Sequence, residues 1–292
     1  MLELKERDPF SNLFLEVIDD PLKKELLFYL MCYSQVVRRE GTLYVELDRF
    51  LSCAYRSFKN NRSHWKDVLV ELNLFTISDL YGNVFTGKDI YRLKEDEVYF
   101  ISIKQEYAEL FEGINTKAFK LWNILSRSMV YRKPTTVQDA VILSAMLFNE
   151  SLYEETLNYC ELCEERYRSE ASYFKALRHL SLLYVGKEAK ALEALKRILI
   201  LLEGIGNVYY GINLDKLRRD VESLIRRLEK GKALSPISIE FVRNRKGKKG
   251  FLHKLLNVVK DFVRKLFRGK RGSPFKEVPV CSKSSPTLYT SL

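Results

Sequence analysis

Apolar residues recur at helical spacing through most of residues 117–230, and the segments between the apolar runs are short. The spacing predicts helices over residues 117–128, 137–148, 152–167, 171–184, 187–203 and 214–229. Gly186 and Gly204 follow two of these runs, as is typical of helix C-caps. Because short connections make successive helices antiparallel neighbours, residues 117–230 are predicted to form an antiparallel helical bundle.

Residues 21–104 indicate a different arrangement. The pattern predicts, in order, a helix after Pro21, a strand at 42–45, helices at 46–54 and 61–73, and strands at 75–77 and 98–103. A polar stretch that contains glycine, residues 78–97, separates the last two strands. This order resembles a winged helix-turn-helix domain, although no signature motif accompanies it.

The third helix of this domain is approached by a basic stretch. In winged helices the third helix usually enters the major groove of DNA. The candidate nucleic-acid-binding residues here are Arg56, Lys59, Arg62 and Lys66. The alternatives are a winged helix that contacts another protein and a basic helix face that is simply solvated.

Charge is divided unevenly along the chain. The whole chain has 49 basic and 38 acidic residues, a net charge of +11. Residues 237–292 contain 14 basic and three acidic residues, so they carry all of the excess and residues 1–236 are neutral. Attraction to a polyanion is therefore expected from the C-terminal tail, whose first basic run contains Arg243, Arg245, Lys246, Lys248 and Lys249.

An amphipathic helix is predicted within the tail, over residues 251–268. Its apolar face is formed by Phe251, Leu255, Val259, Phe262 and Leu266, and basic residues flank it. Such a helix can lie in an anionic membrane surface, bind a partner groove or nucleic acid, or pack on the rest of the protein. Gly231 and Ser235-Pro236 read as the linker that precedes the tail.

A family resemblance covers residues 145–229. The stretches Leu147-Phe148-Asn149, Tyr153-Glu154-Glu155 and Gly211-Ile212-Asn213-Leu214 flank the predicted helices. In layout the region is similar to the domain-of-unknown-function family 309, a small helical domain of bacteria and archaea. That family typically reads Glu-Ala-His-Glu where this chain has Glu155-Thr156-Leu157-Asn158. The resemblance implies a fold and no activity.

One predicted helix, residues 152–167, contains two clusters of side chains that could carry chemistry. Cys160 and Cys163 form a Cys-x-x-Cys pair that could bind metal or act in redox chemistry, but the pair falls in mid-helix without a second ligand pair. We therefore predict buried core cysteines and no metal. Five glutamates crowd the same helix: Glu154, Glu155, Glu161, Glu164 and Glu165. Paired carboxylates could perform acid–base chemistry if buried, but the nearby arginines favour a solvated, ion-paired face.

Taken together, the sequence predicts a mainly α protein. It would consist of an N-terminal arm (1–20), a winged-helix-like domain (21–104), a helical bundle (117–230) and a basic tail (231–292). The expected function is non-enzymatic, regulatory binding, with nucleic acid as partner, no cofactor and a cytoplasmic location. The alternative is a peripheral membrane protein, anchored by residues 251–267, that recruits a protein partner. The scarcity of Gln and the many Lys, Glu and Arg residues suggest a thermophilic source.

Overall fold

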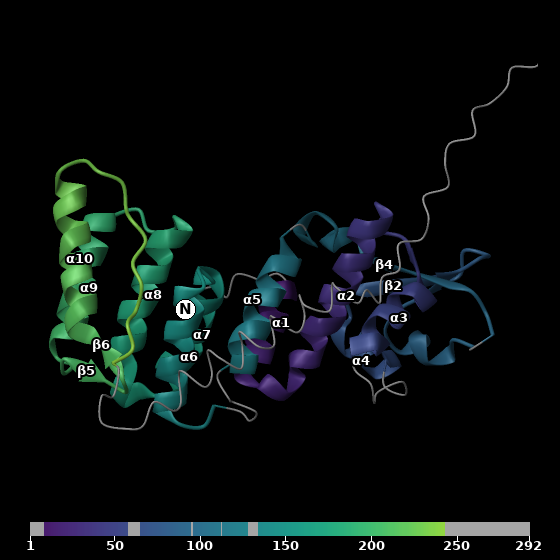
Figure 1. The fold of residues 1–292 in the computed structure, drawn as a ribbon, viewed down its shortest axis with the longest axis horizontal. Coiled ribbons are helices and arrows are strands. Elements are labelled where there is room, and N and C mark those ends of the chain that lie inside the picture. Colours follow the sequence, from purple (N-terminus) through teal and green to yellow (C-terminus); the bar gives the residue numbers. More distant parts are fainter. Residues whose placement is uncertain (1–8, 58–64, 95, 112, 128–133, 243–292) are drawn as a thin grey trace, which may run out of the picture. The chain divides into compact units, whose positions relative to one another are not determined.

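The computed structural model describes residues 9–57, 65–94, 96–111, 113–127 and 134–242 (Figure 1). Over these residues the protein is mainly helical and contains a small antiparallel sheet, which confirms the predicted fold class at this level. Residues 1–242 form one compact unit, and the chain from Arg243 to Leu292, which contains the predicted amphipathic helix, lies outside the described residues.

The first described element is a helix where the sequence was expected to form an arm. Helix α1, Pro9–Asp19, buries five apolar residues at helical spacing: Phe10, Leu13, Phe14, Val17 and Ile18. It packs against α2, α5 and α7. The expectation of an arm over residues 1–20 was therefore wrong for residues 9–19, because the acidic residues around this helix masked a regular apolar stripe.

A group of three helices follows. After a single 3₁₀ turn at Pro21–Lys23, α2 runs over Lys24–Glu40 and ends at Gly41, whose φ of 71° gives a left-handed cap. The short strand β1, Val45–Glu46, leads into α3, Leu47–Ser57. Helix α4, Trp65–Leu72, buries Val68, Leu69 and Leu72, while Trp65 is half-buried against the same core.

The sheet of this region has the strand order β1-β4-β2-β3. Its strands are β2 (Phe75–Asp79), β3 (Val84–Phe85) and β4 (Tyr99–Ile103), and a 3₁₀ segment, Gly87–Arg92, lies between the last two. Ile101 of β4 pairs with both Val45 of β1 and Ile77 of β2, so β4 is central. Burial alternates along β2 and β4, which gives the sheet one face on the core and one facing outward.

A tyrosine links this sheet to α2. The hydroxyl of Tyr33, on α2, donates to the carbonyl of Leu43 and accepts from the Ile103 N–H at 3.0 Å. Its side chain is fully buried. Desolvation raises the pKa of Tyr33 to about 12.

Six helices build the rest of the described chain: α5 (Ile114–Arg127), α6 (Val137–Asn149), α7 (Tyr153–Arg166), α8 (Ala171–Val185), α9 (Ala191–Glu203) and α10 (Leu214–Glu229). Each of α7 to α10 packs against its neighbour in sequence (Figure 1). The predicted helices are present, although α9 begins at Ala191 and not at residue 187. A hairpin that the sequence did not predict, β5 (Val208–Tyr209) and β6 (Ile212–Asn213), joins α9 to α10.

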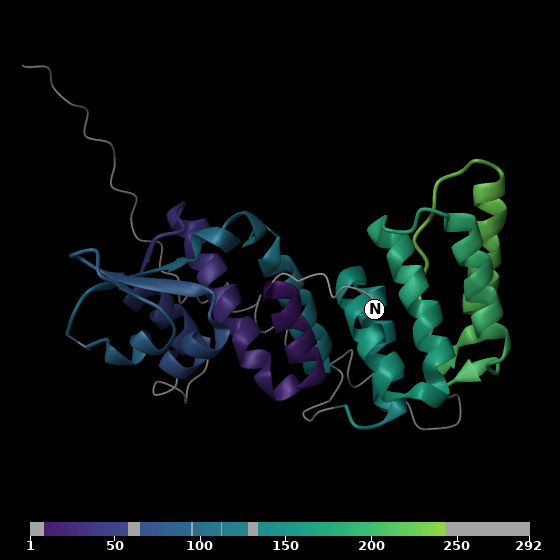
Figure 2. The ribbon, with the colours of Figure 1, turned by 180° about the vertical axis from the view of Figure 1, so that it is seen from behind.

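The chain after α10 turns back and packs on the bundle. We call residues 232–242 the return segment. It runs beside α8 in both ribbon views (Figure 1 and Figure 2), and the Tyr184 hydroxyl of α8 donates to the Ser235 carbonyl at 2.8 Å. Further along, Phe241 forms an antiparallel bridge with Ile212 of β6. The compact unit thus extends to Val242, beyond the boundary at residue 230 that the Gly and Ser-Pro residues suggested.

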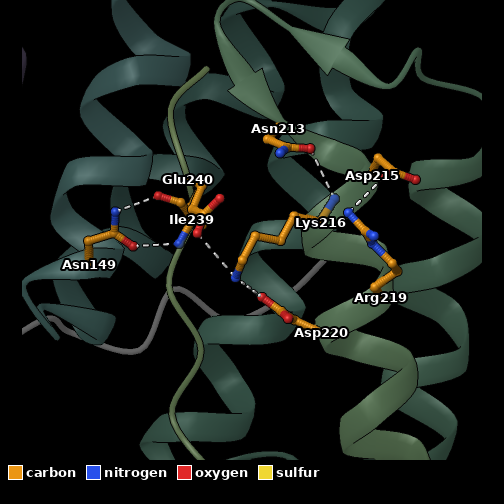
Figure 3. A network of polar contacts seen from close by, with 8 residues as sticks. All are labelled: Asn149, Asn213, Asp215, Lys216, Arg219, Asp220, Ile239 and Glu240. Atoms are coloured by element: carbon orange, nitrogen blue, oxygen red, sulfur yellow. Dashed lines mark hydrogen bonds and ion pairs between the residues drawn. The ribbon is translucent and has the colours of Figure 1, made fainter. Parts of the chain in front are cut away.

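Asn149 anchors the return segment. Its side-chain amide donates to the Ile239 carbonyl at 2.9 Å and accepts from the Ile239 N–H at 2.7 Å, as Figure 3 shows. Ile239 itself is only 2% exposed. Beside it, the Asn213 N–H donates to the Glu240 carbonyl at 2.8 Å, and the Val242 N–H donates to the Gly211 carbonyl at 2.7 Å. These contacts hold the return segment on the bundle up to Val242, the last described residue.

Candidate functional site

The predicted nucleic-acid-binding residues fall partly in the described chain. Arg56 lies in the last turn of α3, but its side chain is outside the described part, as are Lys59 and Arg62. Lys66, in the first turn of α4, donates to the Leu93 carbonyl at 2.8 Å. Its ammonium therefore fastens α4 to the chain before β4, a structural contact that the sequence did not predict.

The tail candidates all lie outside the described residues. This holds for the basic set, Arg243, Arg245, Lys246, Lys248 and Lys249, and for the proposed membrane-contact set, Phe251, Leu255, Val259, Phe262 and Leu266. Within the described residues, no helix is both long and apolar enough to cross a membrane.

Helix α10 carries several basic residues, which by number alone would suggest a site for a polyanion. Lys216 pairs with Asp220 at 2.8 Å and with Glu240 of the return segment at 3.6 Å (Figure 3). Arg219 pairs with Asp215 at 3.0 Å in the same view. Because Lys216 and Arg219 are paired with acidic groups one helical turn away or on the return segment, this part of α10 offers little unbalanced charge.

A pocket of about 290 Å³ opens among α1, α5 and α7. One part of its wall is apolar and the other is charged. The lining residues are Phe10, Ser11, Phe14, Leu110, Gly113, Ile114, Lys117, Glu154 and Glu155. The pocket therefore joins helices that lie more than a hundred residues apart in the sequence.

The charged wall is a compact cluster. Lys117 Nζ lies 2.8 Å from Glu154 Oε2 and 3.2 Å from Glu155 Oε1. Lys187, from the loop before α9, lies 3.6 Å from the other oxygen of Glu154. Burial alone lowers the pKa of Lys117, but the two carboxylates outweigh it and raise that pKa above its ordinary value. Lys117 is therefore a firmly charged ammonium shared by two glutamates.

Glu155 corrects the expectation of a fully solvated acidic face on α7. Its side chain is only 3% exposed, although Glu154 beside it is 43% exposed. The second oxygen of Glu155, Oε2, is buried and has no hydrogen-bond partner among the residues that the structure describes. The sequence placed Glu155 in a charged helix, but only the packing of α1 on α7 and the approach of Lys117 could reveal its burial.

The remaining reactive residues of the bundle have structural surroundings. Cys160 and Cys163 are both fully buried, as predicted, and desolvation raises the pKa of each thiol. Burial likewise lowers the pKa of His179, which lies 3.8 Å from Glu188. In the described ranges, no three His, Cys, Asp or Glu residues come together as candidate metal ligands.

Comparison with known proteins identifies a relative. Over 266 residues the chain is 34% identical to an uncharacterized protein of Aquifex aeolicus (strain VF5), a match that covers 89% of this chain and 86% of the relative. The chain belongs to the family of that protein. No family model matches the chain, and no solved structure matches it. Because 89% of 292 residues exceeds the 242 residues of the folded unit, the aligned region of the family includes part of the tail.

Proposed function

We propose that this protein binds nucleic acid without catalysing a reaction, and that residues 243–292 supply most of the affinity. The observation that carries the proposal is the division of charge at the boundary of the folded unit. Residues 1–242 contain 35 basic and 36 acidic residues, a net charge of −1, whereas residues 243–292 contain 14 basic and two acidic residues, a net charge of +12. Phosphate contacts by Lys and Arg dominate affinity for nucleic acid.

The arrangement of α2 to β4 supports a winged helix as the second contact. A helix, a short strand and two further helices precede a hairpin, and β1 pairs with the last strand of the sheet. In that fold α4 would face the groove, with Arg56, Lys59 and Arg62 on its approach, and the turn between β2 and β3 would form the wing. Tyr81, at the tip of this turn, is 92% exposed.

The charges on α4 favour a secondary role for this helix. Lys66 is committed to the Leu93 carbonyl, and Glu71 pairs with Lys23 at 2.8 Å. Asp67 accepts a hydrogen bond from the Tyr91 hydroxyl at 2.8 Å, so α4 also presents acidic groups. We therefore propose that the winged-helix-like region orients the protein on its target, while the tail supplies long-range attraction.

Two further features support the proposal. The alignment with the Aquifex relative extends into the tail, so part of the tail has a counterpart in the relative. The contacts of Asn149 and Gly211 hold residues 239–242 on the bundle, so the folded unit and its near-neutral charge extend to the residue before the basic run. The resemblance of residues 145–229 to family 309 remains a proposal about the fold of that unit.

The test compares DNA binding by the full chain and by residues 1–242, measured by fluorescence anisotropy with a labelled 20-base-pair duplex. The cut falls after Val242, because a cut at residue 236 would remove Ile239 and expose the bundle. Circular dichroism checks that the shorter chain is folded. We expect the truncated protein to bind at least a hundredfold more weakly, as the loss of several phosphate contacts implies. Equal affinity of the two chains would overturn the proposal.

Paired variants separate nucleic acid from a membrane as the partner of the tail. Replacing Phe262 and Leu266 by Ser removes apolar burial, whereas replacing the five basic residues Arg243, Arg245, Lys246, Lys248 and Lys249 by Gln removes charge. A nucleic-acid-binding tail tolerates the first change and loses DNA affinity with the second. Binding to vesicles of anionic lipid that the Ser variant abolishes, without DNA binding by the intact chain, would instead support the membrane alternative.

A further inference from the structure

We propose that Cys32 of α2 and Cys53 of α3 form a reversible disulfide bond when the protein meets a low-molecular-weight disulfide. Both residues are thiols in the structure, and they lie 21 positions apart on helices that pack against each other. They belong to the folded unit, so this modification is independent of the tail and of the proposed nucleic-acid contact.

The first argument is the position of Cys53 over the turn of α2 that contains Cys32. The Cys53 thiol donates to Gln35 Oε1 of α2 at 3.8 Å. Gln35 comes three residues after Cys32, and a side chain on a helix leans back over the preceding turn, so Gln35 and Cys32 share one face of α2. The sulfur of Cys53 therefore lies against the same turn of α2 as the sulfur of Cys32.

The second argument is the direct contact between the two thiols. A side-chain hydrogen bond joins Cys32 to Cys53, and it raises the pKa of Cys32 more than burial does. Because a thiol hydrogen bond already brings two sulfurs side by side, only a small movement separates this pair from the length of a disulfide bond, about 2.05 Å. The folded chain thus holds the two reactants together, which makes the bond-forming step intramolecular.

The third argument is that the two thiols differ in access. Cys53 is half-buried, whereas Cys32 is only 2% exposed. A small disulfide can therefore reach Cys53 and not Cys32. The hydrogen bond with Cys53, burial and the charge of the Cys53 thiolate all raise the pKa of Cys32, so a covalent bond at Cys53 removes two of these three obstacles to ionisation of Cys32. Cys53 is thus the attacking thiol and Cys32 the resolving thiol.

The reaction is two successive thiol–disulfide exchanges. The Cys53 thiolate attacks one sulfur of the small disulfide, whose S–S bond breaks and releases the first small thiolate. The Cys32 thiolate then attacks Cys53 Sγ, and the second small thiolate leaves. The two cysteines are oxidised by two electrons, the small disulfide is reduced to two thiols, and the two protons lost by the cysteines pass to those thiols. An excess of a reducing thiol reverses both steps.

The test exposes the full folded chain to oxidised glutathione at pH 8, quenches it in acid and alkylates every remaining thiol in guanidinium. Peptide mapping by mass spectrometry then identifies the protected cysteines. We expect Cys32 and Cys53 in one cross-linked peptide that dithiothreitol separates. Cys160 and Cys163 are a matched control, because this pair is fully buried with no accessible attacking thiol, and both should be alkylated. Alkylation of both Cys32 and Cys53, or glutathione retained on Cys53 without the internal bond, would overturn the proposal.

Single variants test the order of the two steps. Cys32→Ser should trap glutathione on Cys53, whereas Cys53→Ser should leave Cys32 unmodified, because the reagent cannot reach it. Modification of Cys32 in the Cys53→Ser variant would refute the assigned order.

Thermal unfolding of the intact chain provides a measurement that needs no variant. A bridge across 21 positions that fits the native packing should raise the unfolding midpoint by about 5–10 °C, and dithiothreitol should reverse the rise. An unchanged or lower midpoint of the bridged protein would show that the bond distorts the packing of α2 on α3, and would contradict a site preformed by the fold.

Discussion

Replacing Asn149 by Ala should release the return segment from the bundle. The substitution removes two hydrogen bonds to the main chain of Ile239, at 2.9 and 2.7 Å. A hydrogen bond contributes about 1 kcal/mol net, so the free energy of unfolding should fall by roughly 2 kcal/mol. For a folded unit of this size such a loss lowers the unfolding midpoint by about 4–8 °C. The effect is testable because Asn149 lies on α6, far in sequence from the segment that it holds.

The assay combines thermal unfolding, followed by circular dichroism, with limited proteolysis by chymotrypsin. Phe241 and Leu234 are the relevant cleavage sites in the return segment. We expect Asn149→Ala to accelerate cleavage there, because a segment detached from the bundle can enter the protease active site, whereas a segment hydrogen-bonded to the bundle cannot. The control is Asn158→Ala on α7, the same substitution at a partly buried asparagine in the bundle. If the two variants unfold at the same temperature and are cleaved at the same rate, the anchoring role of Asn149 is refuted.

Three further perturbations have defined outcomes. The pKa of Tyr33 is raised to about 12 in the folded protein, against about 10 in the unfolded chain. The free energy of unfolding should therefore keep the full contribution of Tyr33 below pH 10 and lose about 3 kcal/mol as the pH rises to 12. Urea unfolding of Tyr33→Phe should show a correspondingly smaller loss of stability at alkaline pH. Phe14→Ala, in a helix that the sequence had suggested to be an arm, should cost about 3–5 kcal/mol in urea unfolding. Lys66→Ala should lower stability by about 1–2 kcal/mol while changing DNA affinity less than twofold, since its ammonium contacts the Leu93 carbonyl.

Local patterns in the sequence predict most of the helices. The apolar spacing in residues 137–229 places α6, α7, α8 and α10 close to their observed bounds, because each helix buries one stripe of its surface. The same rule would have found α1, whose buried residues follow the same spacing over Phe10 to Ile18. The composition of the first twenty residues, rich in acids, obscured that stripe.

Contacts between distant segments were not predictable from local patterns. Residues 231–236 have the Gly, Ser and Pro of a linker, but Ile237, Ile239 and Phe241 alternate with polar residues, a period-two signal of an extended segment on a surface. Nothing in the sequence indicates that Asn149 receives this segment. The pocket depends in the same way on the approach of Lys117 to Glu155, which are 38 positions apart on different helices. Such pairings arise from the packing of whole helices.

The salt dependence of DNA binding tests the central claim most directly. The logarithm of the association constant falls with the logarithm of salt concentration with a slope of about −0.9 for each phosphate neutralised. If about half of the 14 basic residues beyond Val242 contact phosphates, the full chain should give a slope of roughly −6. Residues 1–242 should bind too weakly to measure at 150 mM salt, or with a slope no steeper than about −2. The same steep slope and the same affinity for both chains would contradict the account and place the binding surface on the folded unit.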